Sequence, residues 1–150
     1  RSSDLRELPE AIRSEMTQTI FTEVVGLSDT AFANQLYMTL EQLQFMHQHG
    51  QWIGGHGDAH KWMSHLSVEQ QKADIQATVA FLQQIGVAVD KLSYCYPYGA
   101  YNENTLDILK QNNFKLGFTT QVAQAQIHPE NVLTLHRLDT NDLPLRAKAL

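Results

Sequence analysis

The chain has 150 residues, of which 43% are apolar and 18% are charged, and its formal net charge is −5. This length and composition fit a single domain, residues 1–150, with an ordinary hydrophobic core, and they exclude a disordered chain. No apolar run approaches the roughly 20 residues that a membrane span requires, and no basic stripe is present that would bind nucleic acid.

Helices are predicted for the first third of the chain. Pro9 and apolar residues at steps of four predict a helix that stops at Gly26. Ser28 is a suitable cap for a second helix, and Thr39 and Gln42 have the spacing of a capping box at the start of a third. The three predicted helices cover about residues 9–25, 28–37 and 39–49.

Strands and helices are predicted to alternate over the rest of the chain. The segment 51–55 is apolar at its centre and bounded by glycines, which predicts a buried strand; the other expected strands cover about residues 92–96, 116–120 and 132–138. Helices are expected over about residues 67–85, with Ile75, Val79 and Leu82 facing inward, and 102–111, with Leu106 and Leu109 facing inward. Residues 121–131 are expected to form a long loop. This order favours parallel βαβ units.

The single cysteine, Cys95, excludes an intrachain disulfide and a zinc site made of several cysteines. A lone cysteine fits a reducing compartment without excluding an exported protein. The chain begins with Arg1 and shows no signal peptide, so we expect that residues were removed or that it was cut from a longer protein. Localisation therefore stays open between the cytoplasm and export with the signal removed.

Two histidines four residues apart, His56 and His60, follow the predicted strand 51–55. This spacing can place two imidazoles on one side of a turn, and neutral imidazole is a common metal ligand. The pair differs from the H-E-x-x-H motif, because Gly57 stands where that motif has Glu. The alternative is that both are polar loop residues. The other histidines are interpreted as surface or capping residues: His47, His49, His65 and His128.

A second candidate feature is the turn Y-P-Y-G, residues 96–99, after the predicted strand 92–96. Pro97 fixes its own φ and Gly99 permits a tight bend, so the backbone N–H of Tyr98 would point in a defined direction. A fixed N–H at a strand's carboxyl end can stabilise an oxyanion. The alternative is an ordinary aromatic turn that covers the core.

Taken together, H-G-D-A-H and Y-P-Y-G resemble two motifs of the polysaccharide deacetylase family, the NodB homology domain of carbohydrate esterase family four. The resemblance covers about residues 39–140. It implies that His56 and His60 are metal ligands, that Tyr96, Pro97, Tyr98 and Gly99 line the substrate site, and that the Tyr98 N–H belongs to the oxyanion hole. It also implies an α/β fold, a partial (β/α) barrel of parallel strands with outer helices.

The chain departs from the family pattern at several positions. The family's T-F-D-D-G motif, with the catalytic base and the third metal ligand, is absent, and the chain has no Asp-Asp pair. In the family that motif lies upstream of the matched segments, so an N-terminal truncation would explain its absence from this chain. Gly57 stands where Ser or Thr is usual. Cys95 stands in place of the motif's Arg, and Arg137 is a candidate to supply that guanidinium and orient the base. His136 is a candidate general acid, or simply a strand-end histidine.

The resemblance implies a metal-dependent hydrolase that removes acetyl groups from N- or O-acetylated carbohydrate. On an N-acetylated sugar it would act on the C–N bond of the amide. Zinc is the expected metal, with cobalt, nickel and iron left open and a third Asp ligand expected upstream of residue 1. The isolated chain is expected to bind metal weakly and to be inactive.

The alternative is a non-catalytic remnant that binds glycan or a partner. Its aromatic platform would comprise Trp52, Trp62, Tyr96, Tyr98 and Tyr101. An incomplete barrel is also expected to expose a sheet edge, through which the chain could self-associate.

Overall fold

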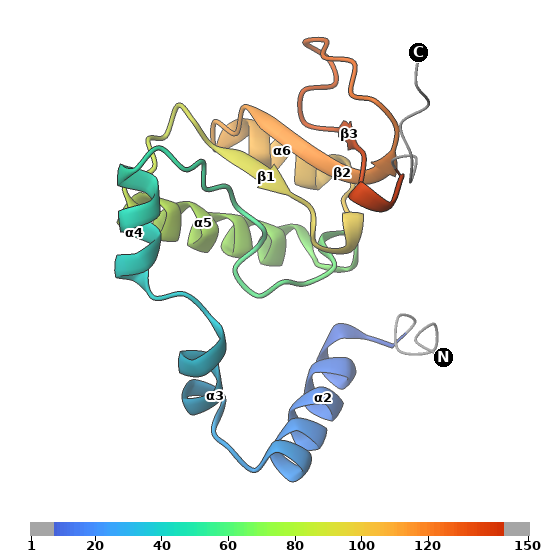
Figure 1. Ribbon diagram of the computed structural model, residues 1–150. Helices are drawn as coiled ribbons and strands as arrows, with labels where there is room; N and C mark the ends of the chain where they lie inside the picture. Colours follow the sequence, from blue (N-terminus) through green and yellow to red (C-terminus); the bar gives the residue numbers. More distant parts are fainter. Residues whose placement is uncertain (1–7, 143–150) are drawn as a thin grey trace, which may run out of the picture. The chain divides into compact units, whose positions relative to one another are not determined.

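The computed structural model describes residues 8–142, and the chain divides into two compact units, the first ending at Leu43 and the second beginning at Gln44 (Figure 1). The interpretation of residues 1–150 as one domain remains a prediction.

The first unit contains the helices α2 (Glu10–Val25) and α3 (Asp29–Leu36). Gly26 ends α2 in the left-handed conformation (φ 67°), and the Ser28 hydroxyl accepts a hydrogen bond from the N–H of Ala31. Both helices therefore begin and end close to where the sequence predicts. Neither has a buried residue, so the apolar side chains of both helices remain at least partly exposed.

The helix α4 (Leu40–Gln48) runs across the boundary between the units and begins with the predicted reciprocal hydrogen bonds between Thr39 and Gln42. Within the second unit, its later residues contact the end of the helix α5 (Val68–Ile85). The Gln44 amide donates to the Gln84 carbonyl, and a ring nitrogen of His47 lies 3.2 Å from the Gly86 carbonyl oxygen.

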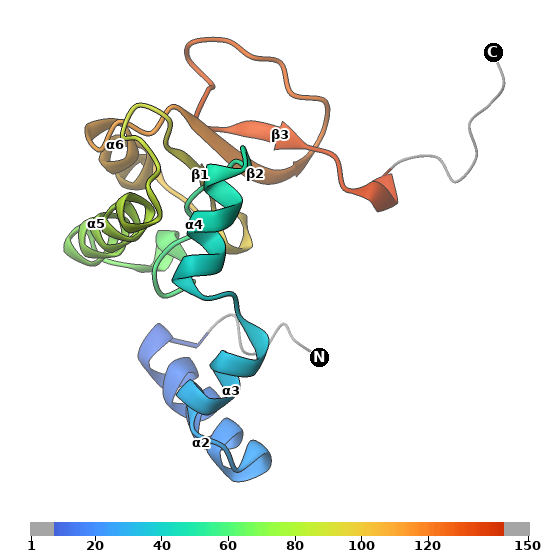
Figure 2. The same cartoon turned by 60° about the vertical axis from the view of Figure 1, so that its left-hand side comes forward.

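The second unit is built on a three-stranded parallel sheet in the order β1 (Ser93–Cys95), β2 (Leu116–Val122) and β3 (Leu135–Arg137). Figure 2 shows α5 and the helix α6 (Glu103–Gln111) on the same side of this sheet. Within residues 8–142, β3 pairs with β2 alone and is therefore an edge strand.

The core of the second unit lies between the sheet and these two helices. Both helices start with capping boxes, at Ser67 and Asn102. The largest fully buried apolar side chains include Ile75, Leu82, Leu92, Tyr94, Tyr96 and Leu109. A buried polar pair also joins the helices, since the Thr105 hydroxyl donates to Gln71 Oε1 at 2.7 Å.

Three details differ from the predicted elements. The segment 51–55 is not a strand: only Gly55 pairs, through an isolated parallel bridge with Tyr94, because two glycines leave it few side chains to pack. On α6 the inward face runs through Ile108 and Leu109, whereas Leu106 is half-buried, as is Val79 on α5. The β2 strand extends to Val122, so the following loop is shorter at its start than predicted.

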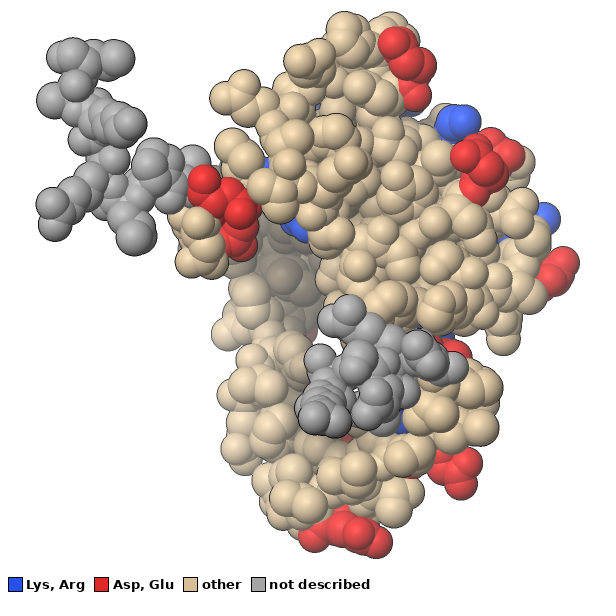
Figure 3. All heavy atoms as spheres, turned by 90° about the vertical axis from the view of Figure 1, so that its right-hand side faces the viewer, with Lys and Arg blue, Asp and Glu red and all other residues tan. Residues whose placement is uncertain are grey.

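Charge distribution and helix length can be compared with the sequence-based expectations over residues 8–142. Lys and Arg side chains do not gather into a patch on the face shown in Figure 3. None of the helices within residues 8–142 is long and apolar enough to span a bilayer.

Candidate metal and deacetylase site

The loop that carries the histidine pair begins directly after Gly55, which forms an isolated parallel bridge with Tyr94 of β1. The N–H of Gly55 donates to the Ser93 carbonyl, and the N–H of Cys95 donates to the Gly55 carbonyl, each at 2.8 Å. The chain then turns through Gly57 (φ 77°) and His60 (φ 51°). Because His60 is not glycine, its left-handed backbone is a strained conformation that the surrounding contacts must hold.

The rings of His56 and His60 face each other across this turn. Their Nε2 atoms lie 3.1 Å apart, and the ring centroids are separated by 4.7 Å. The Nδ1–H of His56 donates to the Cys95 carbonyl at 2.7 Å, because a carbonyl oxygen can only accept. This hydrogen bond fixes the tautomer of His56 and leaves its Nε2 lone pair directed at His60.

The geometry of the pair fits two ligands of one metal ion. Two imidazole nitrogens at about 2.0–2.1 Å from a tetrahedral zinc ion are about 3.3 Å apart, close to the observed separation of the Nε2 atoms. Partial burial lowers the pKa of His60, and the charge of His56 lowers it further. The neutral ring that binds a metal is thereby favoured. Without a metal, an N–H of His60 can donate to His56 Nε2.

No third ligand joins the pair in the described part of the chain. Within residues 8–142, no group of three or more His, Cys, Asp or Glu side chains is placed to hold a metal ion. The carboxylate of Asp74 on α5 accepts hydrogen bonds from the backbone N–H groups of Asp58 and Ala59, which lie between the two histidines. Asp74 was not predicted from the sequence, since no spacing rule links a helix residue to a loop in an earlier part of the chain.

The second predicted feature, the turn Pro97–Gly99, follows β1 directly. Tyr98 is left-handed (φ 58°), and the amides of Gly99 and Ala100 donate to the carbonyls of Tyr96 and Pro97. The N–H of Tyr98 finds no backbone acceptor within residues 8–142. Gly99 (φ 71°) is needed both for its backbone angle and for space, because a Cβ there would overlap the Thr120 hydroxyl.

Aromatic contacts bring the histidine loop and this turn together. The Tyr98 ring stacks on Trp62 with centroids 4.6 Å apart, and it meets the His60 ring edge-on at 4.8 Å. Trp62 also stacks on His65 at 5.5 Å. The two sequence motifs are therefore neighbours in space.

The other aromatic residues of the suggested platform do not join this cluster. Tyr96 is buried, and its hydroxyl donates to the Leu133 carbonyl at 2.6 Å, so its ring is not available to a sugar. The Tyr101 ring contacts the Tyr96 ring at a tilt of 31°. The exposed Trp52 donates to the Ser93 hydroxyl, at the opposite end of β1 from the turn. Burial of Tyr96 leaves it a structural role, and its backbone alone adjoins the site.

Cys95 lies between the histidine pair and Arg137. Its carbonyl accepts from His56, and its sulfur is 3.9 Å from Arg137 Nη1. Arg137 is further anchored by its Nε, which donates to the Thr119 carbonyl at 2.8 Å. The guanidinium thus lies beside the residue that stands in place of the family motif's Arg. It lines a pocket of about 240 Å³ together with Thr120.

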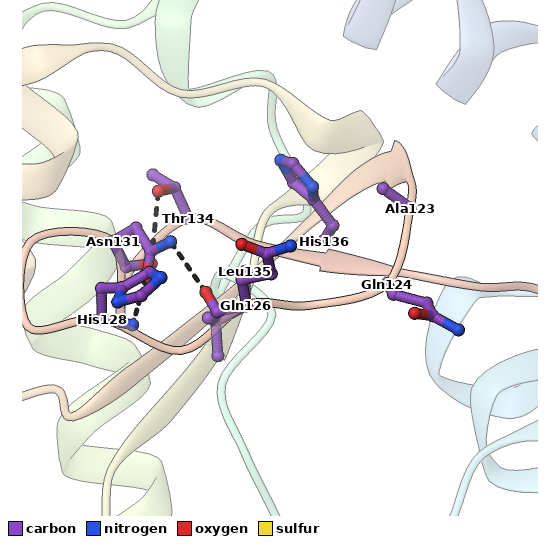
Figure 4. Close-up of a pocket in the computed structure, with 8 residues that line it drawn as sticks. All are labelled: Ala123, Gln124, Gln126, His128, Asn131, Thr134, Leu135 and His136. Atoms are coloured by element: carbon purple, nitrogen blue, oxygen red, sulfur yellow. Dashed lines mark hydrogen bonds between the residues drawn. The ribbon is translucent and has the colours of Figure 1, made fainter.

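His136 lies in different surroundings. It lines a pocket of about 290 Å³ formed with the loop between β2 and β3, in which Asn131 is hydrogen-bonded to Gln126, His128 and Thr134 (Figure 4). Neither His56, His60 nor the Pro97–Gly99 turn lines this pocket. Adjacent residues of a strand point to opposite faces, so the side chains of His136 and Arg137 lie on opposite faces of the sheet.

A parallel α/β sheet with a converging histidine pair and a Pro-Tyr-Gly turn at one strand end is the arrangement that the resemblance to the carbohydrate deacetylases predicts. The chain matches the polysaccharide deacetylase family over residues 15–117, more than half of its length. It belongs to that family.

Relatives and solved structures agree with this assignment. The chain is 29% identical to the putative polysaccharide deacetylase YxkH of Bacillus subtilis over 82% of this chain and 42% of that protein. It resembles the structure of the Streptococcus pyogenes deacetylase PplD in complex with acetate (30% identity, TM-score 0.61, 67% of this chain and 44% of that one). It also resembles IcaB from Ammonifex degensii (26% identity, TM-score 0.52, 67% and 46%). The chain spans less than half the length of each. These neighbours confirm the predicted fold class, an α/β fold that is part of a (β/α) barrel.

Proposed function

We propose that this chain is part of a metal-dependent hydrolase, an enzyme that removes acetyl groups from N- or O-acetylated carbohydrate. In this proposal the chain contributes His56 and His60 as metal ligands. The observation that carries the proposal is the convergence of the two Nε2 atoms at 3.1 Å, with the tautomer of His56 set by Cys95. The family membership supplies the substrate class.

The residues of the chain have distinct parts in this proposal. A divalent metal, with zinc expected, would polarise the acetyl carbonyl and lower the pKa of a bound water. The N–H of Tyr98, which has no backbone acceptor within residues 8–142, would donate to the oxyanion of the tetrahedral intermediate. The Arg137 guanidinium, which lies beside Cys95, would orient a carboxylate base supplied by another part of the protein. We assign no acid role to His136, which lines a separate pocket.

The described residues 8–142 bring together two ligands of the expected three, and the sequence contains no Asp-Asp pair. We therefore expect weak metal binding and no deacetylase activity from this chain by itself. The alternative is a remnant that binds glycan or a partner and catalyses no reaction. It is supported by the same observation, the absence of the two aspartates of the T-F-D-D-G motif. Reading the codons upstream of Arg1 separates the two: a T-F-D-D-G-like segment favours the enzyme, and a start codon with nothing before it favours the remnant.

The test of the metal site is titration of Zn²⁺ into the wild-type chain by isothermal calorimetry. We expect weak binding that His56→Ala and His60→Ala each abolish, because a single remaining imidazole is a poor site. The control is His128→Ala, which removes an exposed imidazole outside the pair. Binding that survives both ligand substitutions, or turnover of an acetylated sugar by wild-type residues 1–150, would contradict the proposal.

A further inference from the structure

The buried acid Asp74 has no role in the proposed chemistry, yet it contacts the middle of the histidine loop. Asp74 lies on α5 with 8% of its surface exposed. Its Oδ1 accepts from the N–H of Asp58 at 3.1 Å, and its Oδ2 accepts from the N–H of Ala59 at 3.2 Å. These are two of the three residues between the ligand histidines.

We infer that Asp74 is the positioning residue of the metal site: its carboxylate holds the 57–60 turn so that the Nε2 atoms of His56 and His60 converge. The inference rests on the proposed function and extends it to a residue outside the two matched family motifs. Hydrogen bonds from two successive amides to one carboxylate are charge-assisted and bidentate, so they fix orientation as well as distance.

Gly57 explains how the carboxylate reaches these amides. A Cβ at Gly57 would lie 3.2 Å from Asp74 Oδ1 and 3.3 Å from Pro97 Cγ, tighter than ordinary contacts. The left-handed φ of 77° also suits glycine. Position 57, where the family usually has Ser or Thr, is therefore a glycine in this chain, and the carboxylate of Asp74 approaches its backbone closely.

The backbone of His60 needs such a support. Its left-handed conformation (φ 51°) is strained in a non-glycine residue and persists only where neighbouring contacts enforce it. Asp74 binds the two residues immediately after Gly57, between the two left-handed positions. On the other side, the ring of Tyr98 contacts His60. The loop is thus held from α5 and from the Pro97–Gly99 turn.

The test compares Asp74→Ala and Asp74→Asn with the wild-type chain and with Asp90→Ala, which removes an exposed carboxylate from the same unit. We expect the two Asp74 variants to weaken Zn²⁺ binding about tenfold or more, as loss of a supporting partner around metal ligands does, while Asp90→Ala leaves it unchanged. Asparagine should not rescue, because its amide group can accept from only one of the two N–H groups.

Hydrogen exchange separates release of the loop from unfolding. The amides of Asp58 and Ala59 should lose protection in both Asp74 variants while those of α5 keep theirs. If the amides of Asp58 and Ala59 lose protection in the Asp74 variants but the affinity for Zn²⁺ stays at the wild-type value, the inference is overturned.

A readout that needs no metal keeps this inference separable from the proposed function. The wild-type chain should show a nuclear Overhauser effect between the rings of His56 and His60, and Asp74→Ala should lose it. If the wild type binds no Zn²⁺, the proposed metal site fails, whereas a ring contact that survives in Asp74→Ala overturns the positioning role by itself.

Discussion

Two helices of this chain, α2 and α5, carry similar sequence signals and have different surroundings. Each has apolar residues at helical spacing, and each ends at a glycine in the left-handed conformation. On α5, Ile75, Leu82 and Ile85 are buried against the second unit. On α2, no residue is buried, and Ile20 has 57% of its surface exposed.

The difference shows that periodicity predicts a helix without predicting its partner. Caps and glycine stops are local, so both helices begin and end near the predicted residues. Burial needs a second element, which the sheet and α6 supply for α5. Stability and chemistry in the described chain should therefore be concentrated in the second unit, an expectation that substitutions in the two units can test.

Truncation of a core side chain should give the largest effect. Leu109→Ala removes a fully buried side chain of α6, and we expect a loss of about 2–5 kcal/mol in the unfolding free energy of the second unit. Ile20→Ala, on α2, should change stability by less than about 0.5 kcal/mol. Urea unfolding followed by far-ultraviolet circular dichroism measures both. Equal losses would mean that the α2 face is packed in solution.

Two glycines with nearly equal backbone angles give the next comparison. A methyl group added at Gly99 (φ 71°) would overlap Thr120, whereas one added at Gly26 (φ 67°) would meet nothing within 4 Å. Both alanine variants incur the left-handed cost of about 1–2 kcal/mol, and Gly99→Ala adds overpacking, for a total of about 2–4 kcal/mol. Thermal unfolding of the two variants should differ accordingly; equal shifts would show that the turn at Gly99 relaxes.

A smaller comparison uses two buried tyrosines of the second unit. The Tyr96 hydroxyl donates to the Leu133 carbonyl, so Tyr96→Phe should cost about 1 kcal/mol. The Tyr94 hydroxyl is buried without a partner among the described residues, so Tyr94→Phe should be neutral or stabilising. Chemical unfolding of both variants against the wild type checks the sign. Destabilisation by Tyr94→Phe would indicate a hydrogen bond, for example to a buried water.

The sequence predicted the elements of this fold better than their packing. Capping pairs such as Ser67 and Gln70 determine helix starts locally, whereas the segment 51–55, which contains two glycines, pairs with β1 only at Gly55. At the site, the spacing of His56 and His60 left two interpretations open, and the family resemblance favoured metal ligands, a role that stays a prediction. It could not find Asp74, whose contact with the loop exists only after α5 folds back on it, and it did not predict that Tyr96 turns inward.

The smallest expected effect is a pH dependence that belongs to the second unit alone, since residues 8–43 contain no histidine. The pKa of His60 is lowered in the folded state, so the unfolded chain binds more protons as pH falls below about 6.5. The contribution of His60 to stability is therefore present above that pH and is lost as pH falls through the folded pKa. Because most of the His60 side chain is solvent-exposed, the effect is small.

The test measures the unfolding free energy at pH 7.5 and at pH 5.5. The decrease between these two pH values should be larger in the wild type than in His60→Ala. Equal falls in the two proteins would mean that burial and the neighbouring His56 do not lower the pKa of His60 in the folded chain.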